Sequence, residues 1–201
     1  KLLLCAYQGS SNSSELTRNA AKTVAEAIGA QFYDLDIDPI LKQYNKLAEQ
    51  VLGRNLDWSK DDIAMQNIQA RVRSPGIWFL ANLFGMILLC TSNRSEGAVG
   101  YCTMDGDTSG GLSPVAGIDK NYLRRWLRWL ETEGPAGLHP IPEMKVITSQ
   151  QPTAELRPQS MHQTDESDLM PYDVLEEIEG AAIEDNRSPM ECFKLLRSKE
   201  E

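Results

Sequence analysis

The chain has 201 residues, 41% of them hydrophobic, and this size and composition suit one globular domain with a sizeable core. Its formal net charge of −9 at pH 7 argues against a nucleic acid or an anionic membrane as partner, because both favour a basic face. A small anionic substrate needs only a local basic cluster, and the candidates for one are Arg71, Arg73, Arg124, Arg125 and Arg128.

The first part of the chain has the pattern of a strand, a helix and a second strand. Residues 2–7 predict a buried strand, and residues 8–14 form a polar loop with helix-capping side chains. Glu15 opens a helix with apolar residues at helical spacing, which stops at Gly29. Residues 31–37 alternate like a strand, and this order of elements predicts parallel α/β architecture.

The middle of the chain predicts two helical regions and a strand. Residues 39–52 are helical, and a second helix begins at residues 61 and 62, with apolar residues along one face. We expect the Ser-Pro-Gly sequence at 74–76 to break or kink this helix, which resumes over 77–84. The apolar run at 86–90 has the composition of a buried strand.

The last third predicts helices joined by polar segments. Residues 121–131 form an amphipathic helix whose two tryptophans, at positions 126 and 129, we expect in the core or in a dimer contact. Residues 134–142 form a loop, and 152–168 form a long polar stretch that should be mobile without ligand. Helices over 171–183 and 189–196 close the chain.

The most informative stretch is residues 90–120, which follows the apolar run. Polar Thr, Ser, Asn and Glu side chains come first, then a loop rich in Gly, Asp and Ser that ends in Asp119-Lys120 at the head of a helix. Open α/β sheets bind ligands at such loops, at the carboxyl ends of their parallel strands. Small residues there let phosphate oxygens approach the backbone, and a carboxylate can hold the metal that accompanies a nucleotide.

Other features of the composition narrow the class of protein. The four cysteines lack CxxC or disulfide-like spacing, which indicates a reducing cytoplasm. No apolar run of membrane length and no signal-like segment is visible in the sequence. His139 and His162 give little material for a zinc site or a Ser-His-Asp triad, and neither receives a role. Because the sequence opens on a strand already under way, we expect further sequence upstream.

Five motifs occur in an order that carries more weight than any one of them. They are the loop at 7–15, QNIQAR at 66–71, TSNRSE at 91–96, the Gly/Asp/Ser segment at 106–120, and PTAEL with QTDE within 152–166. Together they resemble the synthetase domain of NAD+ synthetases, most of all the long, glutamine-dependent variant. The similarity extends from Leu2 to Arg197.

The resemblance implies a fold and a reaction. The fold is a doubly wound parallel α/β sheet of the adenine nucleotide α-hydrolase-like (Rossmann-like) type, in the N-type ATP pyrophosphatase family, with residues 1–201 as a single synthetase domain. ATP would adenylate the nicotinate carboxylate of deamido-NAD+ and release pyrophosphate, and ammonia made from glutamine would then displace AMP. Positioning, charge neutralisation by Mg²⁺ and lysine, and water exclusion would carry the catalysis without a side-chain nucleophile.

The chain also departs from the family pattern. The family's first strand carries an SGGxDS loop that grips pyrophosphate and supplies a magnesium-binding Asp, and we expect it just upstream of Lys1. The family's basic C-terminal tail and its nitrilase-like glutaminase domain, which makes the ammonia, are likewise not among the 201 residues. We therefore expect this chain to be inactive by itself, and its full-length form to be a cytoplasmic homo-oligomer, often a homodimer.

Matching positions in the motifs imply roles for five residues. Thr91 and Thr153 would contact ATP, and Lys120 would meet the ATP phosphates. Glu96 would bind Mg²⁺ or lie close to the nicotinate of deamido-NAD+. Asp107 would contact the nicotinate end of deamido-NAD+. Because Asp107 and Lys120 would lie at the two reacting groups, they are the candidate catalytic residues.

Asn67 and Arg71 lie four residues apart, which places them on one helix face. They could reach the ribose, pyrophosphate or nicotinate carboxylate of deamido-NAD+, and an arginine suits bidentate capture of such anions. Ser10 and Ser11 are weaker candidates.

Each candidate also has an ordinary structural interpretation. Thr91 could cap a turn, Glu96 could begin a helix near a Ser cap, and Asp107 could be a turn residue. Lys120 could be a solvated helix residue, and Thr153 could be an ordinary polar residue of a loop. Asn67 and Arg71 could belong to a row of surface side chains with Asp61 and Asp62.

Two other functions fit part of the pattern. One is another ATP-pyrophosphatase-type ligase, such as a GMP-synthetase-like or tRNA-thiolating enzyme, although the acidic charge disfavours tRNA and the QNIQAR and TSNRSE motifs disfavour the guanine branch. The other is a non-catalytic nucleotide-binding module that has lost its phosphate loop.

Overall fold

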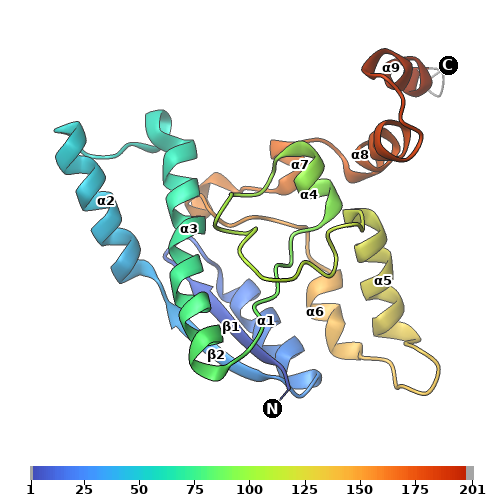
Figure 1. The fold of residues 1–201 in the computed structure, drawn as a ribbon, viewed down its shortest axis with the longest axis horizontal. Helices are drawn as coiled ribbons and strands as arrows, with labels where there is room; N and C mark the ends of the chain where they lie inside the picture. The colour runs from blue at the N-terminus through green and yellow to red at the C-terminus, as the bar shows by residue number, and fades with distance from the viewer. Residues whose placement is uncertain (1, 198–201) are drawn as a thin grey trace.

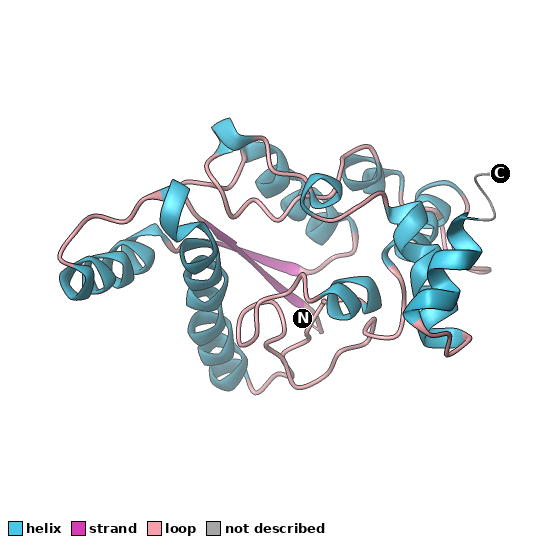
Figure 2. Ribbon diagram, turned by 90° about the horizontal axis from the view of Figure 1, so that it is seen from above, coloured by secondary structure: helices cyan, strands magenta, loops and turns pink. Residues whose placement is uncertain are grey.

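A computed structural model describes residues 2–197, in which helices surround a short parallel sheet (Figure 1). The strands β1 (Leu4–Gly9) and β2 (Gln31–Asp36) pair in parallel, in a register that sets Leu4 opposite Gln31. Helix α1 (Glu15–Ala27) connects them, and its N-cap Ser14 accepts a hydrogen bond from the Thr17 backbone. The predicted strand, helix, strand order is therefore confirmed, and Figure 2 shows how far helices outweigh strands.

Helices α2 (Asp38–Leu52) and α3 (Trp58–Phe84) follow the sheet and share a small core with its end. Buried Ile37, Leu41 and Val72 form this core, and Ile68 packs against it. Helix α3 begins three residues earlier than predicted, because Asp57 caps it by accepting a 2.7 Å hydrogen bond from the Ser59 backbone.

Helix α3 continues through Pro75, so of the predicted break or kink at 74–76 the break is wrong, and a kink stays a prediction. A proline inside a helix removes one backbone hydrogen bond. Here neighbouring side chains hold this part of the helix: Arg73 Nε donates to the Gln8 carbonyl at 3.2 Å, and the Ser74 and Ser109 hydroxyls lie 2.7 Å apart. These contacts keep the two halves of α3 in one helix.

The predicted buried strand at 86–90 is also wrong. Its described partner is an isolated parallel bridge between Leu89 and Leu112, where the Cys90 N–H donates to the Leu112 carbonyl at 2.8 Å. Ile87 is 74% exposed rather than buried. A strand needs a series of backbone hydrogen bonds to a neighbouring strand, and within residues 2–197 this segment forms a single bridge.

The second half of the described chain is helical and irregular. The expected helices near 121–131, 171–183 and 189–196 are confirmed, whereas the short ones between them were not predicted. The elements, with the 3₁₀ turns η1 and η2 and the π-helical turn η3, are α4 (Arg94–Val99), α5 (Lys120–Thr132), η1 (Pro142–Met144), α6 (Lys145–Thr148), η2 (Gln159–Met161), α7 (Asp165–Asp168), α8 (Tyr172–Glu179), η3 (Gly180–Glu184) and α9 (Pro189–Arg197). Helix α9 lies far from the sheet in Figure 1.

Several expectations about burial need correction. Residues 2–7 do not form a buried strand: Leu2 and Leu3 are exposed and most of β1 is half-buried. Trp126 is 40% exposed and Trp129 36%, so neither belongs to the core, and the alternative of a dimer contact stays a prediction. Among residues 2–197 the structure contains no helix with the length and apolarity needed to cross a membrane.

Candidate active site

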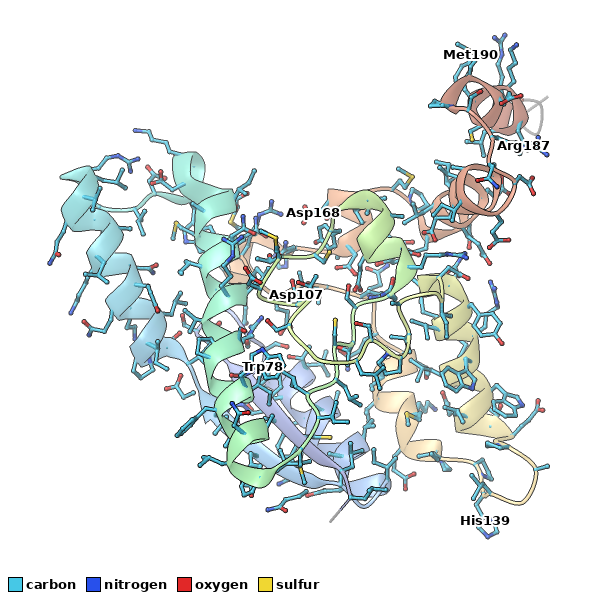
Figure 3. All side chains as sticks on the ribbon, in the orientation of Figure 1. Trp78, Asp107, His139, Asp168, Arg187 and Met190 are labelled. Atoms are coloured by element: carbon cyan, nitrogen blue, oxygen red, sulfur yellow. The ribbon has the colours of Figure 1, made fainter. Side chains whose placement is uncertain are left out.

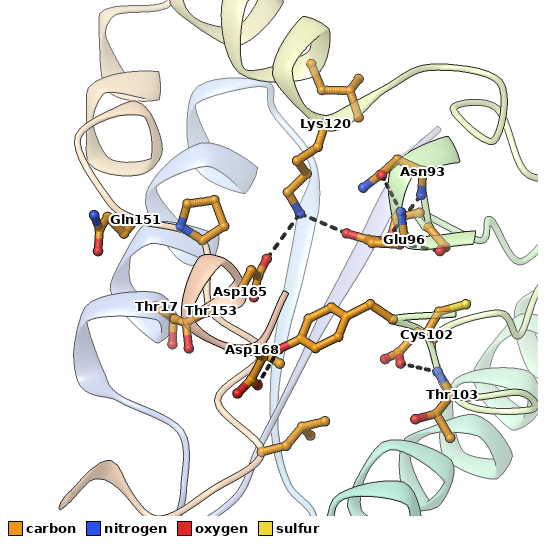
Figure 4. Close-up of a pocket in the computed structure, with 18 of the residues that line it drawn as sticks. Thr17, Asn93, Glu96, Cys102, Thr103, Lys120, Gln151, Thr153, Asp165 and Asp168 are labelled. Carbon is orange, nitrogen blue, oxygen red and sulfur yellow. Dashed lines mark hydrogen bonds and ion pairs between the residues drawn. The ribbon is translucent and has the colours of Figure 1, made fainter. Parts of the chain in front are cut away.

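A pocket of about 880 Å³ lies between α3, α4, α5 and the segment that leads to α7 (Figure 4). This volume is typical of a small-molecule site. Its lining includes most of the residues predicted from the motifs: Asn67, Thr91, Glu96, Asp107, Lys120 and Thr153. Arg71 is not among its lining residues. Segments far apart in the sequence thus converge on one cavity.

Glu96 is fixed by the start of helix α4. Asn93 caps this helix by accepting a 3.1 Å hydrogen bond from the Glu96 N–H, and Glu96 Oε2 accepts one from the Asn93 N–H at 3.2 Å. Ser92 Oγ donates to the same Oε2 at 3.0 Å. The cap is therefore an asparagine rather than a serine, and this capping box leaves Glu96 Oε1 for other contacts.

Lys120 opens helix α5 and contacts that second oxygen. Asp119 caps the helix by accepting from the Tyr122 N–H at 2.7 Å, and the Lys120 N–H donates to Ser95 Oγ at 3.0 Å. The Lys120 Nζ lies 2.8 Å from Glu96 Oε1 (Figure 4). Both side chains are about one-fifth exposed, so solvent screens this ion pair only in part.

Asp107 and Asn67 belong to one hydrogen-bond network. Asp107 Oδ2 accepts from the Thr103 N–H at 2.9 Å, and Thr103 Oγ1 donates to Asn67 Oδ1 at 2.9 Å. The Cys90 thiol donates to the Asp107 carbonyl at 3.2 Å. Asp107 therefore holds its own turn against α3, and the aspartate and asparagine predicted to bind deamido-NAD+ lie on one wall. Thr103, which links them, was not predicted.

Arg71 supports this loop from outside the pocket. Its Nε donates to the Met104 carbonyl at 3.0 Å, and its side chain is exposed. Its predicted contact with deamido-NAD+ stays a prediction. Three other arginines of the predicted basic clusters, Arg73, Arg124 and Arg128, line the pocket instead, and burial lowers the pKa of Arg73. Cationic walls of this kind suit an anionic ligand.

The polar stretch at 152–168 covers one side of the pocket. Thr153 Oγ1 donates to the Gln163 carbonyl at 2.7 Å, so the stretch is folded on itself. Arg157 anchors it to α3, because its guanidinium lies 2.8 Å from Asp62 and 2.7 Å from Asp168. The hydrogen bonds that Arg157 donates to Asp62, and then the one it donates to Asp168, raise the pKa of its guanidinium. Mobility without ligand stays a prediction.

Asp165 is a pocket residue to which the motifs gave no role. The residue is 4% exposed, and its Oδ2 accepts a 2.6 Å hydrogen bond from the Tyr172 hydroxyl. Burial raises the pKa of the Asp165 carboxyl. The sequence signal was present in QTDE at 163–166, but nothing in that motif shows which acidic side chain turns inward.

Figure 3 places His139 at the tip of a loop far from Asp107. His162 is the C-cap of η2, with a left-handed φ of 47°, and lines a smaller pocket beside the polar stretch. Neither histidine faces the main pocket, and both stay without a role.

The family resemblance implies Mg²⁺, whose protein ligands would have to come from the carboxylates of the pocket. Among residues 2–197 no cluster of three or more His, Cys, Asp or Glu side chains could hold a metal by itself. A nucleotide-borne Mg²⁺ takes one or two carboxylates besides phosphate oxygens and waters. Glu96 lies on the pocket wall, and its Oε1, outside the capping box, would fit such a minimal role by exchanging Lys120 Nζ, now 2.8 Å away, for the cation.

Parallel strands and a pocket with arginines in its lining, beside a glycine-rich loop, define the class: an α/β protein with a candidate site for an anionic small molecule. The model of the NAD synthase family matches residues 4–201, and the chain belongs to this family.

Relatives and solved structures agree with the family. The chain is 34% identical over 189 residues to a glutamine-dependent NAD(+) synthetase from Aquifex aeolicus, covering 94% of this chain and 31% of that protein. It is 36% identical over 181 residues to one from Synechocystis, covering 90% of this chain and 30% of that protein. The chain therefore spans about a third of the length of these curated relatives.

A crystal structure of a glutamine-dependent NAD(+) synthetase from Cytophaga hutchinsonii matches with a TM-score of 0.79 and 42% identity, covering 98% of this chain and 30% of that one. An NH3-dependent NAD synthetase from Campylobacter jejuni, at 16% identity and a TM-score of 0.61, covers 96% of this chain and 71% of that one and shares the fold. The α/β fold class predicted for the chain is thus confirmed.

Proposed function

We propose that the chain is the synthetase core of a glutamine-dependent NAD+ synthetase, which converts deamido-NAD+ to NAD+ with ATP and with ammonia from glutamine. The observation that carries this proposal is the convergence of Lys120, Glu96 and Asp107 on one pocket from three separate segments. The names of the relatives at 34–36% identity support the same reaction.

The chemistry has two balanced steps. A nicotinate carboxylate oxygen bonds to the α-phosphorus of ATP as the bond to the β-phosphate oxygen breaks and pyrophosphate leaves. Ammonia then bonds to the activated carboxyl carbon, AMP departs with its oxygen, and one ammonia proton is released. Lys120 would stabilise the charge that develops on the phosphates, and this requires no covalent bond to the protein.

The other candidates would bind and orient the two substrates. Thr91 and Thr153, both in the pocket lining, would contact ATP. Asp107 and Asn67 would hold deamido-NAD+ in the pocket, with Asp107 at the nicotinate end, and Arg71 would reach the same substrate from outside the pocket lining. Their support comes from the motif positions together with the shared wall that Asp107 and Asn67 form.

Mg²⁺ would be held by Glu96 together with the phosphates of ATP, and when bound it would neutralise phosphate charge. An ADP complex exists for a glutamine-dependent NAD+ synthetase from Acinetobacter baumannii, which supports an adenine nucleotide as ligand of this chain.

We also propose which domains, oligomeric state and cellular location accompany this core in the full-length protein. Residues 1–201 form one synthetase domain that works with the SGGxDS phosphate loop and a nitrilase-like glutaminase domain, in keeping with the share of the relatives that the chain covers. A homo-oligomer would cover exposed apolar side chains on α2 and α3, such as Val51, Phe79 and Leu83. A cytoplasmic location fits the four free cysteines.

Substituting Glu96→Gln in the full-length protein tests the function. Loss of the carboxylate charge should reduce ATP-dependent NAD+ formation about a hundredfold, because a neutral amide would hold the phosphate-neutralising Mg²⁺ far more weakly. The assay follows NAD+ from deamido-NAD+, ATP, Mg²⁺ and ammonia.

Glu26→Gln is the matched control, because this glutamate lies on the exposed surface of α1 and should keep full activity. Turnover by the Glu96→Gln protein within about twofold of the unmodified enzyme would contradict the proposed role.

A further inference from the structure

The Lys120 ammonium lies between two carboxylates that come from distant parts of the chain. Its Nζ is 2.8 Å from Glu96 Oε1 on α4 and 3.8 Å from Asp165 Oδ2 on α7. Figure 4 shows the lysine side chain extended from α5 with one acid on either side. Asp165 is the more deeply buried of the two, with a side chain only 6% exposed.

Two neighbouring elements hold Asp165 in this place. The Tyr172 hydroxyl at the start of α8 donates to its Oδ2 at 2.6 Å. Helix α8 is in turn bonded to the lysine's own helix, because Asn121 Nδ2 donates to Asp173 at 2.7 Å and to Glu176 at 3.0 Å. The distance between Asp165 and Lys120 is therefore set by the packing of α8 on α5.

The hydrogen bonding of Asp165 is incomplete. Its Oδ1 is buried and has no hydrogen-bond partner in the part of the chain that the structure describes. Leaving a buried polar atom unpaired is unfavourable, and more so for a charged group. If Asp165 served only to hold α7 in place, hydrogen bonds to both of its carboxylate oxygens would make the fold more stable. The carboxylate thus has one unpaired oxygen, Oδ1, while its other oxygen, Oδ2, lies 3.8 Å from a lysine that already has another partner, so the group can serve that lysine as a second acceptor.

We propose that Asp165 is a positioning residue that gives Lys120 a second acceptor, so that the lysine stays directed into the pocket when Glu96 engages a substrate. This inference rests on the proposed function and deepens it. Because Asp165 lies in the polar stretch at 152–168, the docking of that stretch also sets the position of the lysine for phosphate chemistry.

The test measures NAD+ formation by the full-length enzyme with the substitution Asp165→Asn. Loss of the ion pair between Asp165 and Lys120 predicts a kcat about tenfold lower, with KM for ATP changed less than about threefold. Tyr172→Phe keeps the carboxylate but loosens it, and should give a smaller decrease in kcat. Asp185→Asn, on an exposed aspartate, should leave kcat unchanged.

A double substitution separates positioning from a structural role. In a Lys120→Gln protein the lysine is already gone, so adding Asp165→Asn should change kcat by less than about twofold. A multiplicative further loss would overturn the inference, as would normal kcat in both Asp165→Asn and Tyr172→Phe proteins. If those two are normal while Glu96→Gln is inactive, only this inference fails. Full activity in the Glu96→Gln and Lys120→Gln proteins would instead contradict the proposed function itself.

Discussion

Among single residues, Asp165 has a buried carboxyl whose pKa makes the stability of the fold depend on pH. Burial is the largest influence on this group and raises its pKa, so folding favours the protonated form over the ionised form. The folded state therefore binds more protons than the unfolded state just above the ordinary aspartate pKa, and stability from this group falls as pH rises through that window. The groups that face it are Lys120, Glu96, Asp168 and Tyr172.

Asp165→Asn should consequently stabilise the fold at neutral pH while it lowers kcat. The gain in melting temperature should be present above the raised pKa and should vanish near pH 3.5, below about the ordinary aspartate value. Thermal unfolding from pH 3.5 to 8 measures it, with Asp185→Asn as the exposed control. A loss of stability at neutral pH would mean that the carboxylate stabilises the fold.

Sequence reasoning reached some of these residues and missed others for a physical reason. Glu96 and Lys120 stand in recognisable motifs, whereas the cap of α4 was expected to be a serine and is Asn93, at Asn-x-x-Glu spacing. Asp165 could not be singled out, because its importance comes from a contact with Tyr172 and Lys120 that tertiary packing creates.

At the scale of elements, two segments that each lead to a pocket residue, Thr91 in one and Asp107 in the other, approach each other closely. A Cβ on Gly110 would lie 2.5 Å from the Cys90 backbone nitrogen, closer than any side chain can come. This contact lies beside the bridge between Leu89 and Leu112, which joins the two segments. The glycine is thus required by backbone proximity, and the glycine-rich sequence was informative for that reason.

Gly110→Ala should destabilise the protein by about 2 kcal/mol, because the added methyl forces the loop away from Cys90. Chemical denaturation gives the free energy of unfolding. Gly97→Ala is the matched control: a Cβ there meets nothing within 4 Å, and alanine favours helix α4, so stability should stay the same or rise. Equal unfolding free energies for the two variants would refute the close contact.

Arg157 should hold the polar stretch at 152–168 against α3 through its contacts with Asp62 and Asp168. Arg157→Gln removes both ion pairs, so amide hydrogen exchange across this stretch should speed up while exchange in α9 stays unchanged. Arg187→Gln, which affects an exposed pair near the C-terminus, is the control. Unchanged exchange in the stretch would show that other contacts suffice to hold it.

Two element predictions failed through tertiary context. Local propensity marked Pro75 as a helix breaker, yet contacts of Arg73 and Ser74 with other segments hold α3 continuous. The apolar run at 86–90 had strand composition, but a strand also needs a ladder partner, which composition cannot supply.

At the scale of the whole molecule, the order of elements and the motif order specified more than any single residue did. The parallel pair β1 and β2, joined by α1, follows from the alternation of patterns in the first third of the chain. Ordered motifs pointed to the NAD synthase family, and their residues converge on one pocket although they lie far apart in sequence. The central claim is therefore that this pocket is where ATP activates the nicotinate carboxylate.

A single-turnover measurement of pyrophosphate release by the full-length Lys120→Gln enzyme, with ATP and deamido-NAD+ but no ammonia, tests that claim most directly. The rate of release should fall about a hundredfold, because the charge on the departing pyrophosphate loses its lysine. Lys22→Gln, on the exposed face of α1, should release pyrophosphate at the normal rate. Pyrophosphate release by the Lys120→Gln enzyme within about twofold of normal would contradict the assignment of this pocket.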